Sequence, residues 1–451
     1  MGVTTEFNPA DYRRLLIREC QIEGRVVSAR YSLIGSNGAD DVEFAETFDF
    51  GGIDSTVAFD PRLLRLLALT AGVSYYKASA PETVSIDFPI TESEAAYVAA
   101  VIRGGLGEFA FENQLPDALT PMLDYRLGGD VEIAAAESAW TLDAEPLVAV
   151  GGGKDSVVSI EALKAAGRTP TLFSVNRYQP IEDCIAVSGL SSVHVLRKID
   201  RTLIELNGAG AYNGHIPVTA INSVIALIAA DVAGLGSVVM SNEQSADIEN
   251  LSWHGFEINH QWSKSREYEN LLRSMLADYG MDPARYFSLL RGLPESDIAD
   301  LFRGCTAYFD VFVSCNRSFA LDESRRRSRW CGECPKCLFV FVLLAPRIGR
   351  DRLCAIFAQN VLDNDQNTEL FLELAGLTAH KPFECVGDYS EVAEAFVDLM
   401  DDSEWSDDAV VRRMADDRTR LMASAANRVP VAESENIPAP YAGVLGALVS
   451  R

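Results

Sequence analysis

The chain of 451 residues is long enough for about two or three domains, and 48% hydrophobic and 23% charged residues are typical of a globular protein with an ample core. Its formal charge of −26, from 39 Lys and Arg against 65 Asp and Glu, disfavours a nucleic acid partner, because binding a phosphate backbone needs a cationic face. Since no apolar run is long enough for a membrane span, the N-terminus lacks a signal pattern and the nine cysteines follow no disulfide-framework spacing, we expect a cytoplasmic protein without a membrane span.

Residues 1–145 are predicted to form an α+β domain. Apolar residues at every second position predict strands, and apolar residues at every third or fourth position predict helices. The expected strands are Arg25–Tyr31, Val42–Phe48 and Val84–Pro89, and the expected helices are Leu63–Ala71 and Glu92–Gly104. Nothing in this part identifies a chemistry by itself.

Residues 146–346 repeat a pattern of strand, loop and helix. The strands are expected at Leu147–Val150, Thr171–Val175, Val193–Leu196 and Ser237–Met240, with helices such as Val218–Ala233 between them. This alternation predicts an α/β fold with a parallel sheet, whose ligands bind at the carboxyl ends of the strands. Residues 347–451 are predicted to be mostly helical until about Ala425 and then to form an irregular tail.

Three glycines, Gly151, Gly152 and Gly153, follow the first of these strands and precede the helical run Val157–Ala166. Glycines let the backbone approach a polyphosphate, and the amino end of the next helix faces the anion. The loop fits neither the Walker nor the dinucleotide spacing, because no Gly-Lys-Ser/Thr closes it and Ser156 replaces the last glycine. It resembles the Ser-Gly-Gly-x-Asp-Ser loop of the PP-loop ATP pyrophosphatases, with Gly151 in place of the first serine. A plain glycine-rich turn is the alternative.

The carboxylate of Asp155 in this loop would repel a pyrophosphate unless a cation lay between them. Its position therefore favours a magnesium ion that bridges the carboxylate and the phosphate oxygens. Glu243, just after the predicted strand Ser237–Met240, is a second candidate ligand, and a carboxylate that begins a helix is an equally good interpretation of it. The charge of Lys154 could compensate for the hydroxyl that Gly151 lacks.

Cys331, Cys334 and Cys337, together with Cys315, supply four thiols whose C-x-x-C-x-x-C spacing can surround a tetrahedral ion. Zinc bound by four thiolates would be structural, because no position remains open for water. Reduced or redox-active cysteines and an iron–sulfur cluster are the alternatives. A similar arrangement occurs in the deazaguanine-nitrile synthases, which are PP-loop enzymes.

Taken together, these segments resemble the UDP-N-acetyl-alpha-D-muramoyl-L-alanyl-L-glutamate epimerases, the MurL family of peptidoglycan synthesis. The resemblance extends to about residue 390. Its segments are Ala71–Lys77, Gly105–Phe109, Gly151–Ser156, Ser159–Leu163, Asn213–Thr219, Ser241–Glu243, Asn259–Lys264, Ser314–Arg317, Trp330–Cys337 and His380–Gly387. It implies a PP-loop core of the adenine nucleotide alpha hydrolase type and a UDP-linked muramoyl dipeptide as substrate. ATP and Mg²⁺ would assist the conversion of the terminal L-glutamate to D-glutamate, a step that serves cell shape and cell division. Other muramoyl-peptide ligases are candidate partners.

The implied reaction explains why ATP would be used. A proton next to an ionised carboxylate is a very weak acid, and an acyl-adenylate removes that charge. We therefore expect adenylation of the glutamate α-carboxylate with pyrophosphate release, removal and return of the α-proton, and hydrolysis to AMP. Lys154 and the loop amides would hold phosphates and Asp155 the magnesium. His260 and Cys385 are the candidate acid and base, with His215 behind them; closure of the activated glutamate to an oxazolone is an alternative route.

Three arginines, Arg317, Arg325 and Arg329, are candidates for binding the UDP diphosphate, and a solvated charged face is the alternative interpretation. Two other functions stay open at this stage. One is a PP-loop nucleobase-modifying synthase that resembles the deazaguanine-nitrile synthases. The other is a regulator that binds ATP without cleaving it.

Overall fold

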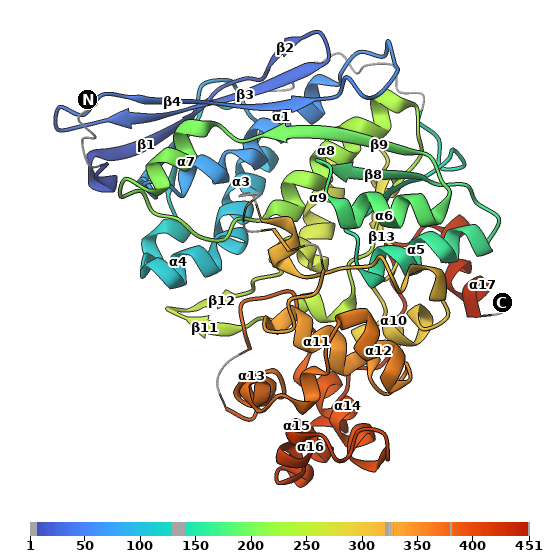
Figure 1. Cartoon of the computed structure of the whole chain (residues 1–451). Helices are drawn as coiled ribbons and strands as arrows, with labels where there is room; N and C mark the ends of the chain where they lie inside the picture. Colours follow the sequence, from blue (N-terminus) through green and yellow to red (C-terminus); the bar gives the residue numbers. More distant parts are fainter. Residues whose placement is uncertain are drawn as a thin grey trace.

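The computed structural model describes residues 7–128, 140–320, 324, 326–327, 329–378 and 381–449. A single eleven-stranded sheet runs through the upper part of the molecule in Figure 1. Its strand order is β13-β10-β7-β8-β9-β4-β3-β1-β5-β6, with β2 beside β3. The C-terminal helices lie together below this sheet in the same view.

Five parallel strands form the middle of the molecule and confirm the α/β prediction. They are β7 (Leu147–Ala149), β8 (Thr171–Val175), β9 (Ser192–Lys198), β10 (Val238–Met240) and β13 (Tyr286–Ser288). Numbered along the chain, these strands lie in the spatial order 3-2-1-4-5. The order reverses between β7 and β10, and ligands of doubly wound sheets bind at such a point.

The N-terminal strands continue the same sheet across residue 145. They are β1 (Tyr12–Ile17), β2 (Gln21–Glu23), β3 (Val26–Gly35), β4 (Val42–Asp49), β5 (Thr83–Ile86) and β6 (Met122–Asp124). β4 pairs antiparallel with β9, so that Phe48 lies opposite Arg197. The predicted N-terminal domain, residues 1–145, and the predicted α/β part, residues 146–346, are therefore joined in one hydrogen-bonded sheet.

Polar side chains cap the two longer of the four described N-terminal helices, α1 (Pro61–Ala71) and α3 (Glu92–Gly105). The other two are α2 (Val73–Tyr76) and α4 (Gly107–Asn113). Asp60 Oδ1 accepts a hydrogen bond from the backbone N–H of Arg62 at 2.8 Å, and Thr91 with Glu94 forms a capping box. α1 packs against α8 of the middle part, and α3 packs against α9.

Helices cover both faces of the parallel strands. They are α5 (Lys154–Ala165), α6 (Gln179–Ser188), α7 (Arg201–Asn207), α8 (Val218–Ala233), α9 (Arg266–Asp278) and α10 (Glu295–Phe302). Val238 and Met240 pack with α8 and α9 in one buried cluster, whereas Val239 between them packs with α5 and α6 in another. Successive side chains of β10 thus point to opposite faces of the sheet and pack in two separate cores.

The C-terminal part is helical, as predicted. Its helices are α11 (Pro335–Leu344), α12 (Arg350–Phe357), α13 (Thr368–Leu374), α14 (Tyr389–Asp401), α15 (Ala409–Ala415) and α16 (Arg418–Ala425). None of the described helices is long and apolar enough to cross a membrane.

The expected irregular tail is wrong in part, because it ends in a helix that packs on the middle of the molecule. α17 (Val444–Val449) lies against α5, and Tyr441 before it is buried. The Arg168 guanidinium lies 4.1 Å from the centre of the Tyr441 ring. Aromatic and aliphatic side chains thus anchor a segment whose prolines alone suggested a loop.

Candidate active site

The glycine loop leaves β7 at its carboxyl end, beside β10, at the reversal of strand order. Gly152 has a φ of 76°, which favours glycine, and a Cβ on Gly153 would lie 2.4 Å from Ser314 Oγ. A Cβ on Gly151 would meet only open space. Since no side chain caps α5 at Gly153, the loop leaves the amino end of that helix accessible to an anion.

Lys154 lies beneath this loop between two carboxylates. Its amine is 1% exposed and contacts Asp155 and Glu295, while Lys336 Nζ lies 3.9 Å from the Glu295 carboxylate. Burial raises the pKa of Asp155, but the charges of Lys154, Lys336 and Lys264 lower it by more, so that it stays below 3.8. Asp155 is therefore ionised and can hold a cation.

Glu243 follows β10 and caps the short 3₁₀ helix Gln244–Asp247. Its Oε2 accepts hydrogen bonds from the Ala246 backbone N–H at 2.7 Å and from Ser245 Oγ at 3.1 Å. Burial and the charges of Glu295 and Asp155 raise the pKa of Glu243 to about 7. The helix-start interpretation of this carboxylate is confirmed, and a role as a magnesium ligand stays a prediction.

A second group of side chains, the thiol cluster, consists of Cys385, Lys264, His260, Glu108 and His215. Lys264 Nζ donates to Cys385 Sγ at 2.9 Å, and Cys385 also hydrogen bonds with His260. The Nδ1 atom of His260 in turn hydrogen bonds with a carboxylate oxygen of Glu108. The thiol, imidazole and carboxylate thus form a continuous chain.

The thiol cluster is charged at neutral pH. Burial raises the pKa of the Cys385 thiol, but Lys264 and His260 lower it by more, to well below 9. Burial lowers the pKa of His260, but hydrogen bonds and charges of Cys385 and Glu108 raise it by more, to about 9. Thiolate and imidazolium are therefore the stable forms of this pair.

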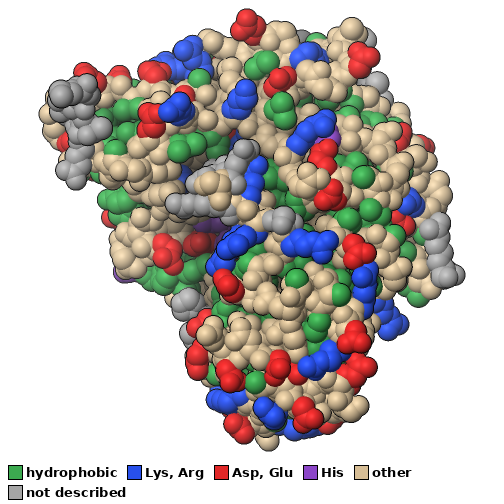
Figure 2. All heavy atoms as spheres, viewed as in Figure 1, with side chains coloured by type: hydrophobic (Ala, Val, Ile, Leu, Met, Phe, Trp, Pro, Cys, Tyr) green, Lys and Arg blue, Asp and Glu red, His purple; other side chains and the backbone are tan. Residues whose placement is uncertain are grey.

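His215 lies against this pair as a neutral imidazole. The centres of the His215 and His260 rings are 4.4 Å apart, and His215 Nδ1 is 3.7 Å from a Glu108 oxygen. Burial, followed by the charges of His260, Lys264 and Lys77, lowers the pKa of His215 to about 3. Figure 2 shows histidine side chains in a hollow near the middle of the visible face, flanked by acidic and basic ones. His215 is half-buried, so that a ligand can reach it.

Glycines at the junction of α3 and α4 allow Glu108 to reach the two histidines. A Cβ on Gly104 would lie 2.2 Å from Trp262, and one on Gly105 would lie 2.5 Å from Pro217. Because side chains are absent there, the helices pack directly on the loops that carry His215 and His260. Glu108 then points from the first turn of α4 to both imidazoles.

Two amide side chains fix the loop of Cys385 against the loop of His260. Asn250 Nδ2 donates to the carbonyl oxygens of Lys381 at 3.2 Å and Pro382 at 2.9 Å, and its Oδ1 accepts from the His260 backbone N–H at 2.9 Å. Gln261 Nε2 donates to the Val386 carbonyl oxygen at 3.1 Å. Asn250 begins a hairpin of β11 (Leu251–Trp253) and β12 (Phe256–Ile258).

Two lysines connect the thiol cluster with the glycine loop. The charges of Lys264 and Lys336 lower the pKa values of both Asp155 and Cys385. Asp155 and Cys385 are only partly buried, whereas Lys154 is fully buried. The predicted residues Lys154, Asp155, His260 and Cys385 thus belong to one charged site, and His215 lies at its edge.

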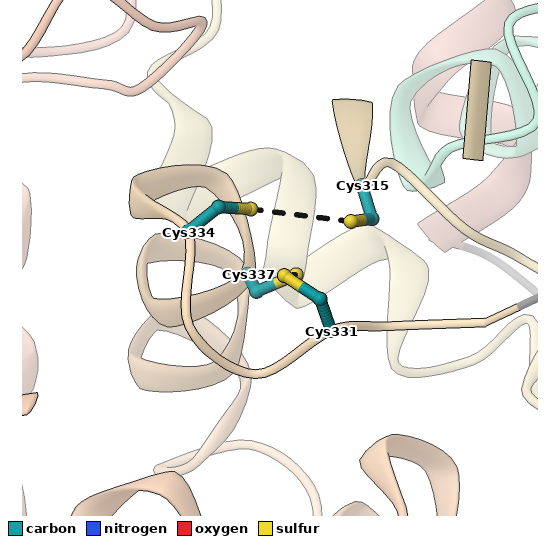
Figure 3. A group of neighbouring side chains, drawn as sticks. All are labelled: Cys315, Cys331, Cys334 and Cys337. Carbon is teal, nitrogen blue, oxygen red and sulfur yellow. Dashed lines mark hydrogen bonds between the residues drawn. The ribbon is translucent and has the colours of Figure 1, made fainter. Parts of the chain in front are cut away.

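The four predicted cysteines also come together (Figure 3). All four sulfur atoms point toward a common centre, and each lies within 4.8 Å of the others. Cys315 Sγ is 4.0 Å from Cys334 Sγ, and Cys331 Sγ is 3.5 Å from Cys337 Sγ. Zinc–sulfur bonds of about 2.3 Å at tetrahedral angles place sulfur atoms about 3.8 Å apart, so the cage fits a zinc ion.

The arginines proposed for UDP lie outside these clusters where the structure describes them. Arg317 pairs with the exposed Glu333 at 2.8 Å, and Arg329 donates to the Asp310 carbonyl oxygen at 3.2 Å. Both arrangements fit the interpretation of a solvated charged face. Arg325 and His380 lie outside the described residues.

Several site residues had no predicted role. Glu108 and Lys264 lie in segments that carry the resemblance to the family, and Lys336 lies between Cys334 and Cys337. Their position beside predicted site residues was the sequence signal that could have identified them. Glu295 lies 141 positions from Lys154 in the sequence and had no such signal. Only the packing of α10 against α5 brings these two side chains together.

Two family models match the chain. The MurL N-terminal domain matches residues 6–289, and the MurL C-terminal domain matches residues 311–429. A curated relative from a Micromonospora strain is 46% identical over 395 residues, which are 87% of each chain. One from Salinispora tropica is 44% identical over 88% of this chain and 86% of its own, and one from Xanthomonas oryzae pv. oryzae is 42% identical over 82% and 81%. All three are named UDP-N-acetyl-alpha-D-muramoyl-L-alanyl-L-glutamate epimerase. No solved structure matches the chain.

Proposed function

Because the chain belongs to the MurL epimerase family and is an isomerase, we propose that it inverts the terminal glutamate of UDP-N-acetylmuramoyl-L-alanyl-L-glutamate from L to D with the help of ATP. The names of the three relatives support the substrate and the stereochemical change. The observation that carries the use of ATP is the position of the glycine loop at the reversal of strand order.

ATP would bind with its phosphates on the glycine loop, in the manner of a PP-loop. The open amino end of α5 supplies N–H groups, and the space beside Gly151 permits close approach. Asp155 would hold Mg²⁺, and Glu243 is the second candidate ligand. Lys154 and Lys336 together balance the charges of Asp155 and Glu295, so that the loop can accept further negative charge.

The α-carboxylate of the glutamate would attack the α-phosphate of ATP and release pyrophosphate. In the resulting acyl-adenylate the negative charge next to the α-carbon is gone, so the α-proton becomes more acidic. His260 and Cys385 would remove and return this proton, since both face the same half-buried site. Hydrolysis would then release AMP and the D-glutamyl product.

The four-cysteine cage would hold a structural zinc ion. Val313, two residues before Cys315, donates its N–H to the Gly152 carbonyl oxygen at 2.8 Å. Zinc at Cys315 would therefore fix the segment on which the glycine loop rests. The four thiolates leave no position for a reacting water, so no catalytic step is assigned to the ion.

A magnesium-dependent assay with the L,L substrate tests the proposal. The chirality of the glutamate and the amounts of AMP and pyrophosphate are measured together, in normal and in heavy water. We expect D-glutamate, one AMP for each turnover and deuterium at the α-carbon. Equal epimerisation rates with and without ATP would contradict the role of adenylation.

A nucleobase-modifying synthase is the second candidate, because the same cysteine spacing occurs in the deazaguanine-nitrile synthases. An epimerase needs no ammonia, so AMP formation that depends on a deazaguanine carboxylate and ammonia would favour this alternative. Pyrophosphate release in the presence of the muramoyl dipeptide would exclude a regulator that only binds ATP.

A further inference from the structure

Cys385 lies in the arrangement of an activated nucleophile. Its sulfur contacts Lys264 at 2.9 Å, and His260 links it by hydrogen bonds to Glu108. A nucleophile in contact with an imidazole that a carboxylate orients is the signature of covalent acyl transfer on unrelated folds. The proposed adenylation offers an acyl group to this same site.

We propose that Cys385 takes the glutamyl group from the adenylate, and that the α-proton is exchanged while the substrate is a thioester. This inference rests on the proposed function, because it needs the acyl-adenylate as acyl donor. It changes the role of Cys385 from a base to a nucleophile, and it gives Glu108 the role of a positioning residue for His260.

Cys385 Sγ attacks the acyl carbon, a C–S bond forms, the bond from that carbon to the phosphate oxygen breaks, and AMP leaves. His260 passes its proton to the departing phosphate and becomes a neutral base. It then takes the α-proton. A water molecule on the opposite face of the planar enolate protonates the α-carbon, and the hydroxide left behind takes the proton from His260, which is neutral again. Finally, water loses a proton to His260 and attacks the thioester. The C–S bond breaks, which restores the Cys385 thiolate and gives the product carboxylate, and one further proton is released to solvent.

The chemistry of the thiolate favours this role over that of a base. A general base works best when its pKa is near the working pH, whereas Lys264 and His260 hold the pKa of Cys385 far lower. Nucleophilicity toward carbon falls less steeply than basicity when a thiol pKa is lowered. A thioester also keeps the α-proton acidic, because sulfur donates little electron density to the carbonyl.

The position of the cysteine suits acyl transfer. Lys264 lies next to Cys385, and its charge also lowers the pKa of Asp155, so that one lysine acts on both the thiol and the carboxylate. Asn250 and Gln261 hold the backbone on both sides of Cys385. The side chain is half-buried, as a group that must meet a substrate requires.

The first test is rapid acid quenching of the full-length protein with ATP, Mg²⁺ and the L,L substrate, followed by intact-mass and peptide mass spectrometry. We expect the mass of the UDP-muramoyl dipeptide acyl group on Cys385, removable by hydroxylamine, in the wild type and in Cys354→Ser. Cys354 is half-buried and hydrogen bonds with none of the residues of the thiol cluster in the described chain. No adduct should form without ATP.

The second test compares Cys385→Ala with the wild type. We expect ATP–pyrophosphate exchange to continue within ~3-fold, while AMP release and epimerisation fall at least ~100-fold. Epimerisation and AMP release at wild-type rates in this variant, or wild-type turnover without any protein-bound acyl group, would overturn the thioester and leave adenylation intact. If the wild type makes neither pyrophosphate nor AMP with this substrate, the proposed function itself fails and the thioester with it.

Discussion

At the scale of single residues, the reactivity of the site depends on opposite charges held at short range. The Cys385 thiolate is balanced by Lys264 and by the His260 imidazolium, and the imidazolium is balanced by Glu108. In a partly buried site such pairs interact more strongly than in water. Removal of one member therefore changes the protonation of its neighbours.

Replacement of Glu108 by Gln should lower the pKa of His260 below about 9, because the carboxylate raises that pKa by its hydrogen bond and its charge. His260 loses its proton as the pH rises through its pKa, so the alkaline limb of kcat/KM should move to lower pH. Turnover should fall on the order of 10²- to 10⁴-fold, as when the orienting carboxylate of a catalytic triad is removed. Glu112→Gln, an exposed position on the same helix, is the control. An unchanged pH profile in Glu108→Gln would contradict the assignment.

Replacement of Lys154 by Met should destabilise the fold, because it removes the nearest cation from the half-buried Asp155 and leaves the buried Glu295 with only Lys336 at 3.9 Å. The loss in the free energy of unfolding should be about 3–5 kcal/mol. Without the lysine charge, which lowers the pKa of Asp155, that pKa rises in the folded state above its unfolded value. Folding then favours the protonated acid, so the deficit should shrink as the pH falls through the raised pKa.

Urea unfolding at several pH values checks this prediction. Lys164→Met, a partly exposed lysine on the same helix, is the control and should change stability by less than ~1 kcal/mol. If the loss in unfolding free energy of Lys154→Met did not change with pH, the two carboxylates would not be its cause.

At the scale of helices and strands, the sequence predicted the elements that repeat and missed the contacts that join them. Alternation and periodicity identified β8 and α8 with their observed bounds, and the glycines identified the turn after β7. The antiparallel pairing of β4 with β9 was not predicted, because nothing local marks which strands become neighbours. Lys264 and Cys385 touch across 121 positions of sequence, a contact that only the packed fold decides.

The contact between the end of α3 and the loop before α8 can be tested by adding one methyl group. Gly105→Ala would place a Cβ 2.5 Å from the rigid ring of Pro217, so the helix must move. We expect a loss of about 1–3 kcal/mol in unfolding free energy, together with loss of epimerisation, because Glu108 moves with the helix. Gly443→Ala, whose Cβ would meet no atom within 4 Å, should stay within ~0.5 kcal/mol of the wild type. Wild-type activity in Gly105→Ala would show that Glu108 does not depend on this packing.

At the scale of the whole molecule, the cysteine cage lies between the C-terminal helices and the glycine loop. Cys334 and Cys337 lie at the start of α11, which is buried along its length, and Cys315 follows the segment that hydrogen bonds with Gly152. A zinc ion would fasten these two parts to each other. The free energy of zinc binding would then contribute to folding and to the shape of the nucleotide loop together.

If zinc fills the cage, its removal should therefore weaken ATP binding, because the ion would fix the glycine loop from outside the substrate site. We expect one zinc per chain by elemental analysis, and a strong chelator should lower both the melting temperature and ATP–pyrophosphate exchange, with recovery when zinc is returned. Cys334→Ser should contain little zinc, since one thiolate of the cage is lost, while Cys354→Ser should bind it normally. If a zinc-free protein melted and exchanged pyrophosphate like the wild type, the proposed coupling between the cysteine cage and the glycine loop would be wrong. Iron in the elemental analysis, together with visible absorption, would instead identify an iron–sulfur cluster as the occupant of the cage.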